Sequence, residues 1–433
     1  MKILIRGGRL VDATQKLDKV GDLYVAAGRV VGVDRIPDGF SPNRTIDAQN
    51  LIVSAGLVDL SARLREPGYE YLATLESEMT AAVAGGVTSL ACPPDTDPAL
   101  DEPGLVEMLK YRAQGLNQCR VFPIGALTTG LDGQRITEMA ELRDAGCLGF
   151  SQAMRPIADT QVLARALAYA ATFNFCVWLQ PQDAYLGRGG FAHDGEVATR
   201  LGLAAIPVTA ETVAIATIIL LMRETGARVH FCRISSARGL DMIHQARLEG
   251  LPVTCDVGVH HLHLSEMDMG WFDSNCHLSP PLRSITDRDA LRAAACSGLI
   301  DAICSDHSPV DEDTKQVPFA ESSVGATGLE LLLPLTLKWG KERGLSLGET
   351  LEPVTTKPAQ ILGIAAGTLQ EGTLADICIF DPNAEWKVEA SSIVSQGKNT
   401  PFLGYNLQGR VQLTLVGGQV IFDRSPKSNK NAQ

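Results

Sequence analysis

The sequence predicts an α/β fold, in which a (β/α)8 barrel is joined to a small β-sandwich domain built from both ends of the chain. The barrel is predicted because eight short apolar runs alternate with helix-like segments. The second domain is predicted because both chain ends contain short strands with alternating apolar residues, separated by turn residues. We expect residues 1–53 and 366–433 to form the sandwich and residues 54–365 to form the barrel.

Each of the expected barrel strands is a short apolar run. The strands are Val58–Leu60, Thr88–Cys92, Val121–Gly125, Gly149–Gln152, Cys176–Leu179, Val229–Ile234, Val253–Val257 and Ala302–Ser305. The helix after the first strand has clear end signals: Thr74 as N-cap, Glu76 and Glu78 in the first turn, and Gly85-Gly86 at its end. Chemistry in such barrels lies at the carboxyl ends of the strands, so we expect the candidate site there.

Composition excludes several classes of function. The 433 residues carry a net charge of −12, which argues against nucleic acid or an anionic membrane as a main partner. No apolar run reaches the roughly 18 residues of a membrane span, and the apolar stretch in Met1–Arg6 is too short for a signal peptide. The ten cysteines are scattered without a CxxC pair, so we expect free thiols in a reducing cytoplasm. The polar tail, residues 425–433, is expected to be frayed.

Specific motifs are distributed along almost the whole chain. They are Gly56–Gly68 (GLVDLSARLREPG), Gly195–Val197, Gly202-Leu203 before Ile206-Pro207, Val259–Leu262, Pro280–Arg283, Asp306–Pro309 and Asn399–Phe402. Taken together, these motifs resemble those of the dihydroorotases, in the amidohydrolase superfamily. The resemblance implies a barrel of the amidohydrolase type. It also implies an enzyme that hydrolyses or closes a cyclic amide with one or two zinc ions, and with an Asp after strand 8 as general base.

The resemblance places the family's metal ligands on residues of other types. Where the family has His ligands or a carboxylate ligand, this chain has Ser61, Arg63, Gln152 followed by Ala153, Gln180 and Arg233. The strand-8 Asp is retained as Asp306, the position of the family's base. Zinc takes three or four N, O or S ligands, and a guanidinium cannot ligate a metal. We therefore expect no cofactor, although zinc is expected of the family.

The two arginines suggest what replaced the metal. An unpaired buried carboxylate is costly, so we expect Arg63 or Arg233 to pair with Asp306 and to substitute for the metal electrostatically. The alternative is that both guanidinium groups point to solvent in the barrel mouth.

The family's substrate-binding positions are only partly retained. Arg65 matches its carboxylate-binding Arg, but Asp95 stands where the family has Asn, and an anion there would repel a carboxylate substrate. Arg65 is therefore either functional or a structural remnant. The remaining candidate ligands are expected to have structural roles: His260, His261, His263, His277, His307, Cys232 and Cys304.

The chain is most similar to the non-catalytic pseudo-dihydroorotases. These occur in some bacteria beside aspartate transcarbamoylase and are needed to assemble that enzyme. The resemblance implies a cytoplasmic structural subunit of pyrimidine biosynthesis, with the aspartate transcarbamoylase catalytic chain as partner and with possible homo-oligomers. Two alternatives stay open. One is an active cyclic-amide hydrolase with an altered metal site at Asp306, and the other is a regulatory barrel that binds a metabolite through Arg63, Arg65 and Arg233.

Overall fold

The barrel is formed by parallel strands in the computed structural model, which describes residues 1–424 of the chain. The tail predicted to be frayed, residues 425–433, lies outside the described residues. The strands are β6 (Leu57–Asp59), β7 (Val87–Cys92), β8 (Arg120–Pro123), β9 (Gly125–Ala126), β10 (Phe150–Ser151), β11 (Cys176–Leu179), β14 (Arg228–Phe231), β15 (Val253–Gly258) and β16 (Ala302–Cys304). All eight predicted runs overlap these strands, and the predicted fold class is confirmed. The predicted run Val121–Gly125 is divided between β8 and β9.

The strands form two sheets that together close the ring. One sheet has the order β6-β7-β8, and the other has the order β16-β15-β14-β11-β10-β9. On one side the sheets meet where Ala62 pairs with His307 in parallel. On the other side the backbone N–H of Leu148 donates to the carbonyl of Pro123 at 3.2 Å. This closure brings the segments after β6 and after β16 together, although they are far apart in the sequence.

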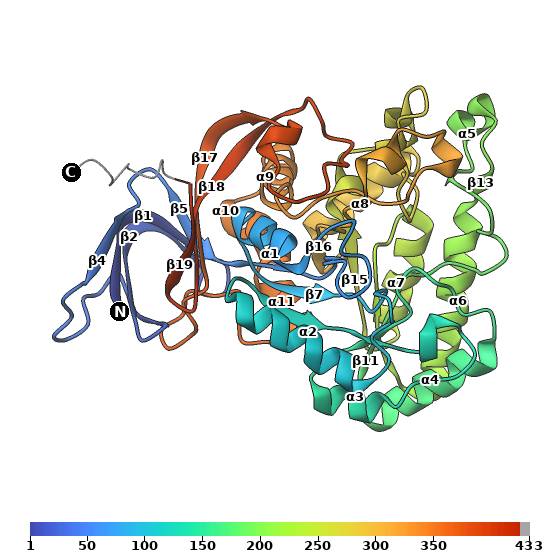
Figure 1. Ribbon diagram of the computed structural model, residues 1–433, viewed down its shortest axis with the longest axis horizontal. Coiled ribbons are helices and arrows are strands. Elements are labelled where there is room, and N and C mark those ends of the chain that lie inside the picture. Colours follow the sequence, from blue (N-terminus) through green and yellow to red (C-terminus); the bar gives the residue numbers. More distant parts are fainter. Residues whose placement is uncertain (425–433) are drawn as a thin grey trace.

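Helices surround the barrel, as Figure 1 shows. They are α1 (Leu75–Ala84), α2 (Pro103–Leu116), α3 (Met139–Ala145), α4 (Thr160–Thr172), α5 (Glu196–Leu201), α6 (Val208–Thr225), α7 (Ala237–Leu248), α8 (Ile285–Ser297), α9 (Leu332–Arg343), α10 (Leu347–Leu351) and α11 (Thr356–Leu362). The predicted cap of α1 is confirmed, because the side chain of Thr74 accepts from the backbone N–H of Ser77 at 3.2 Å. Within residues 1–424, no helix combines the length and the hydropathy needed to cross a membrane.

Both ends of the chain contribute to one eight-stranded sheet beside the barrel, at the left of Figure 1. Its strands are β1 (Lys2–Asp12), β2 (Leu17–Ala26), β3 (Arg29–Val33), β4 (Arg44–Asp47), β5 (Ile52–Ala55), β17 (Ile377–Lys387), β18 (Asn406–Val416) and β19 (Gln419–Asp423). Strand β5 joins the two ends, because it pairs in parallel with β1 and antiparallel with β17. A separate apolar core, which includes Ile3, Leu23 and Ile377, fills this domain. The boundaries at residues 53 and 366 stay predictions.

Candidate functional site at the barrel mouth

Three barrel strands deliver four of the predicted site residues to the mouth. Ser61 and Arg63 follow β6, Arg233 follows β14, and Asp306 follows β16. Arg233 and Asp306 have positive φ angles of 55° and 45°. Such backbone costs of the order of 1 kcal/mol in a residue other than glycine, and it is concentrated at functional sites. The left-handed turn redirects each chain as it leaves its strand.

Asp306 is held by both arginines. Its Oδ1 lies 3.4 Å from Nη1 of Arg63 and 3.5 Å from Nε of Arg233, and it accepts from Oγ of Ser61 at 3.4 Å. The side chains of Arg63 and Arg233 are only 3% and 4% exposed. The prediction that an arginine pairs with Asp306 is confirmed, and the alternative that both guanidinium groups point to solvent is excluded.

Arg233 also joins two further predicted positions to this cluster. Its Nη1 donates to Oγ of Ser61 at 3.0 Å, and its Nη2 donates to Oε1 of Gln180 at 2.6 Å. The amide of Gln180 then donates to Oγ of Ser279 at 3.1 Å. One guanidinium group therefore bridges residues that follow three different barrel strands.

Gln152 lies at the end of β10 and has a different partner. Its Oε1 accepts from Oγ1 of Thr128 at 3.0 Å, while its buried Nε2 has no hydrogen-bond partner among residues 1–424. Ala153, the next residue, is buried and has a positive φ of 52°. The structure thus links four of the predicted positions, Ser61, Gln180 and the two arginines, through hydrogen bonds and ion pairs around Asp306.

The two predicted substrate positions are engaged by the protein itself. Oδ2 of Asp95 accepts from Nε of Arg63 at 2.8 Å. Although burial raises the pKa of Asp95, the charges of Arg63 and Arg65 outweigh it and leave this pKa below its ordinary value. Arg65 donates to the carbonyl of Pro309 and to Oγ of Ser308, both at 2.8 Å. Burial, and then the charge of Arg63, lower the pKa of Arg65 to about 10.

Two guanidinium groups and two carboxylates make up the centre of the mouth. When Arg63, Arg233, Asp95 and Asp306 are all ionised, their formal charges cancel. Burial raises the pKa of Asp306 above its ordinary value, although Arg233 and Arg63 act in the opposite direction. Burial would lower the pKa of Arg233, but the charge of Asp306 together with those of other neighbouring acidic groups outweighs it and raises this pKa. We call these four residues the mouth network.

The mouth network fits a zinc ion poorly. It offers two carboxylates, and each is already paired with a guanidinium group. Guanidinium groups have no lone pair to donate to a metal. Their positive charges would also repel a dication at this position.

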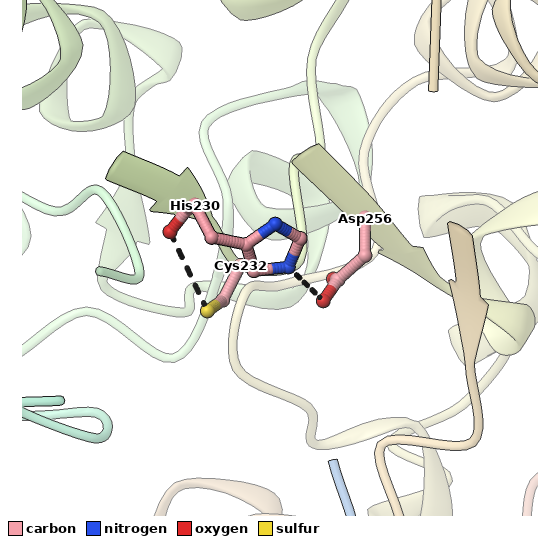
Figure 2. A group of neighbouring side chains, drawn as sticks. All are labelled: His230, Cys232 and Asp256. Atoms are coloured by element: carbon pink, nitrogen blue, oxygen red, sulfur yellow. Dashed lines mark hydrogen bonds and ion pairs between the residues drawn. The ribbon is translucent and has the colours of Figure 1, made fainter. Parts of the chain in front are cut away.

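The prediction that the chain has no metal site is nevertheless wrong. His230, Cys232 and Asp256 are buried and bring three potential ligand atoms within 4.8 Å of one another (Figure 2). Cys232 had been expected to be only a core thiol. The available signal was the His-x-Cys alternation around the end of β14, which puts both side chains on one face of the strand. Asp256 comes from β15, and only the pairing of β14 with β15 brings it alongside.

Two of the other histidines hydrogen-bond to backbone carbonyls, whereas neither ring nitrogen of the buried His260 has a hydrogen-bond partner within residues 1–424. Nε2 of His261 hydrogen-bonds to the carbonyl of Pro280 at 3.1 Å, and Nε2 of His263 to that of Leu335 at 2.9 Å. Burial lowers the pKa of each to about 4. His307 points away from the mouth network, because its Nε2 lies 2.6 Å from Oε2 of the buried Glu78. Sequence reasoning gave Glu78 only a helix-end role and missed this pair.

Comparison with known proteins shows the protein family to which the chain belongs. Residues 50–239 match the Dihydro-orotase-like family model, and residues 198–421 match the Amidohydrolase family model. Together with the barrel and the relatives described next, these matches show that the chain belongs to the dihydroorotase-like proteins of the amidohydrolase superfamily.

The alignments with individual relatives cover almost the whole chain. A dihydroorotase-like protein of Pseudomonas aeruginosa is 46% identical over 420 residues, which cover 97% of this chain and 99% of the relative. The dihydroorotase of Geobacter sp. (strain M21) is 38% identical, over 98% of this chain and 99% of the relative. Among solved structures, the L-hydantoinase (dihydropyrimidinase) from Arthrobacter aurescens superposes with a TM-score of 0.87 at 27% identity. That match covers 98% of this chain and 96% of the other.

Proposed function

We propose that this protein is a non-catalytic, dihydroorotase-like subunit of pyrimidine biosynthesis that helps to assemble aspartate transcarbamoylase. One observation carries the non-catalytic part of the proposal. Asp306, at the position of the family's general base, is held at 3.4 and 3.5 Å by two buried guanidinium groups.

The contacts of Asp306 oppose its use as a base. Hydrolysis of a cyclic amide needs an activated water, and a base that is free to take a proton from it. Oδ1 of Asp306 already faces Arg63, Arg233 and Ser61. Although burial raises the pKa of Asp306, the two guanidinium groups favour its ionised form, and a proton taken up by Asp306 would leave buried positive charge uncompensated. The mouth network therefore stabilises the folded barrel, but it hinders proton uptake by Asp306 during hydrolysis.

The assembly role rests on the resemblance to the non-catalytic pseudo-dihydroorotases, and the relatives support only the dihydroorotase-like family. The chain is 46% and 45% identical to two Pseudomonas proteins named dihydroorotase-like, and 38% identical to a Geobacter protein named dihydroorotase. The dihydroorotase fold is retained along with the family motifs outside the mouth, such as Asn399–Phe402. The barrel keeps the family fold while ion pairs occupy the site at its mouth. Such a barrel is suited to bind another protein chain rather than a substrate.

The test is to mix the purified full-length chain with aspartate transcarbamoylase catalytic chains from the same organism. The mixture and each component alone are compared by size-exclusion chromatography with light scattering. We expect one larger species that contains both chains and has transcarbamoylase activity. Separate elution of the two chains at concentrations of about 10 µM would contradict the assembly role, because subunits of a stable complex bind well below that concentration.

A further inference from the structure

We propose that His230, Cys232 and Asp256 are ligands of a zinc site inside the barrel, beneath the mouth network, with Cys304 as the fourth ligand. Nε2 of His230 and Oδ2 of Asp256 are 2.9 Å apart, and the sulfur of Cys232 completes a group whose ligand atoms lie within 4.8 Å of one another. Figure 2 shows the imidazole edge facing the carboxylate, with the sulfur beside the ring. One His, one Asp and two Cys form a donor set that suits tetrahedral zinc.

The surroundings hold His230 and Asp256 by the side-chain atoms that the metal would not use. Nδ1 of His230 is 2.8 Å from Oγ1 of Thr254. Oδ1 of Asp256 accepts from the backbone N–H of Arg233 at 2.6 Å. Nε2 and Oδ2 are thereby both directed at the proposed ion position. Partners of this kind fix the orientation of metal-binding imidazole and carboxylate groups.

Cys304 lies beside this group but is not one of the three residues whose ligand atoms are within 4.8 Å of one another, so its side chain has to turn to bind the ion. It ends β16, which pairs with β15, and its sulfur lies 3.6 Å from Oδ1 of Asp256. Cys232 and Cys304 are free, buried thiols. The sulfur of Cys232 has one weak contact, 3.8 Å from the carbonyl of His230. The contacts of these two sulfur atoms are weak hydrogen bonds of 3.8 and 3.6 Å, so both side chains can turn toward an ion.

Binding can be written as a balanced exchange. Zinc replaces the hydrogen bond between His230 and Asp256 with one bond to Nε2 and one to Oδ2. The proton held between these two atoms passes to Nδ1 of His230, where it is donated to Oγ1 of Thr254. Each cysteine thiol releases its proton to solvent and binds as thiolate. The competing interpretation is a buried His–Asp hydrogen bond surrounded by thiols that act only as packing groups.

The test is zinc content after saturation with zinc and desalting, in the wild type and in Cys232→Ala. Cys378→Ala is the matched control, because Cys378 is a fully buried free thiol in β17, which pairs with β5 in the sheet formed by the two chain ends. We expect about one zinc ion per chain in the wild type and the control, and at least about tenfold weaker binding in Cys232→Ala. Asp306→Asn should keep its zinc, which separates this site from the mouth. A wild type without zinc, equal zinc in both cysteine variants, or loss of zinc only in Asp306→Asn would overturn the proposal.

A second measurement needs no variant. When cobalt is bound in place of zinc, the wild-type chain should show the near-ultraviolet absorption of thiolate-to-cobalt charge transfer. The band should disappear when a stoichiometric amount of zinc is added. Bound cobalt without this band would mean that no cysteine ligates it, and would overturn the proposal.

Discussion

Replacing Arg233 with methionine removes the guanidinium group that is central to the mouth network. Met keeps most of the apolar stem, but three polar contacts disappear. These are the contact with Asp306 at 3.5 Å, the hydrogen bond to Ser61 at 3.0 Å and the hydrogen bond to Gln180 at 2.6 Å. Because Arg233 is only 4% exposed, solvent does not take the place of the lost group.

The size of the effect follows from opposing contributions. Two unit charges 3.5 Å apart attract by about 5 kcal/mol at an effective dielectric constant of about 20. The variant no longer pays several kcal/mol to bury a guanidinium group, but Asp306 stays buried. Asp306 keeps Arg63, whose Nη1 lies 3.4 Å away. Removing one partner of a buried pair costs about 3–5 kcal/mol, so with this remaining contact we expect a loss of about 3 kcal/mol in the free energy of unfolding.

The measurement is denaturant unfolding followed by circular dichroism, with Arg223→Met as control. Arg223 pairs with Glu249 at 2.8 Å, but both side chains are more than 40% exposed (45% and 44%). An exposed ion pair contributes at most about 1 kcal/mol. If Arg233→Met lowers the free energy of unfolding no more than Arg223→Met does, the contacts of Arg233 in the mouth network do not stabilise the barrel.

Three further predictions concern the surroundings of the network. The double variant Ser61→His with Arg63→His should still hydrolyse no dihydroorotate, because the other ligand positions remain altered; measurable turnover would show that the first strand alone was limiting. Glu78→Gln should lower the free energy of unfolding by about 2 kcal/mol, because the fully buried Glu78 bonds to His307 at 2.6 Å; an unchanged unfolding midpoint would contradict this. Burial raises the pKa of Asp59 from 3.8 to about 6, so ionising it costs stability in the folded state. Relative to Asp59→Asn, the wild type should lose stability as pH rises from about 4 to about 6, and a pH-independent difference between the two would refute this.

The sequence predicted the barrel because buried parallel strands are short apolar runs, and such runs are visible without any long-range information. It also predicted that Arg63 or Arg233 would pair with Asp306, because the carboxyl ends of barrel strands converge on one face, and both arginines do so. That prediction needed only the strand to which each residue belongs.

The remaining contacts depend on pairings that a single sequence does not contain. Asp95 was expected at a substrate position, but the loop after β7 turns its carboxylate onto Arg63. Glu78 matched the acidic first turn of a helix, yet it bonds to His307, 229 residues away. Asp256 joins His230 only because β14 and β15 are neighbours. In each case the partner is set by strand order and side-chain direction.

The most direct test of the central claim is the rate of dihydroorotate hydrolysis by the purified, zinc-supplemented chain. The dihydroorotase of Geobacter sp. (strain M21), which is 38% identical, serves as the active reference. If the mouth network has replaced the catalytic centre, the rate should equal that of the buffer blank, and Asp306→Asn should leave it unchanged. Turnover above the blank that Asp306→Asn abolishes would show that Asp306 still acts as a base, and would contradict the account.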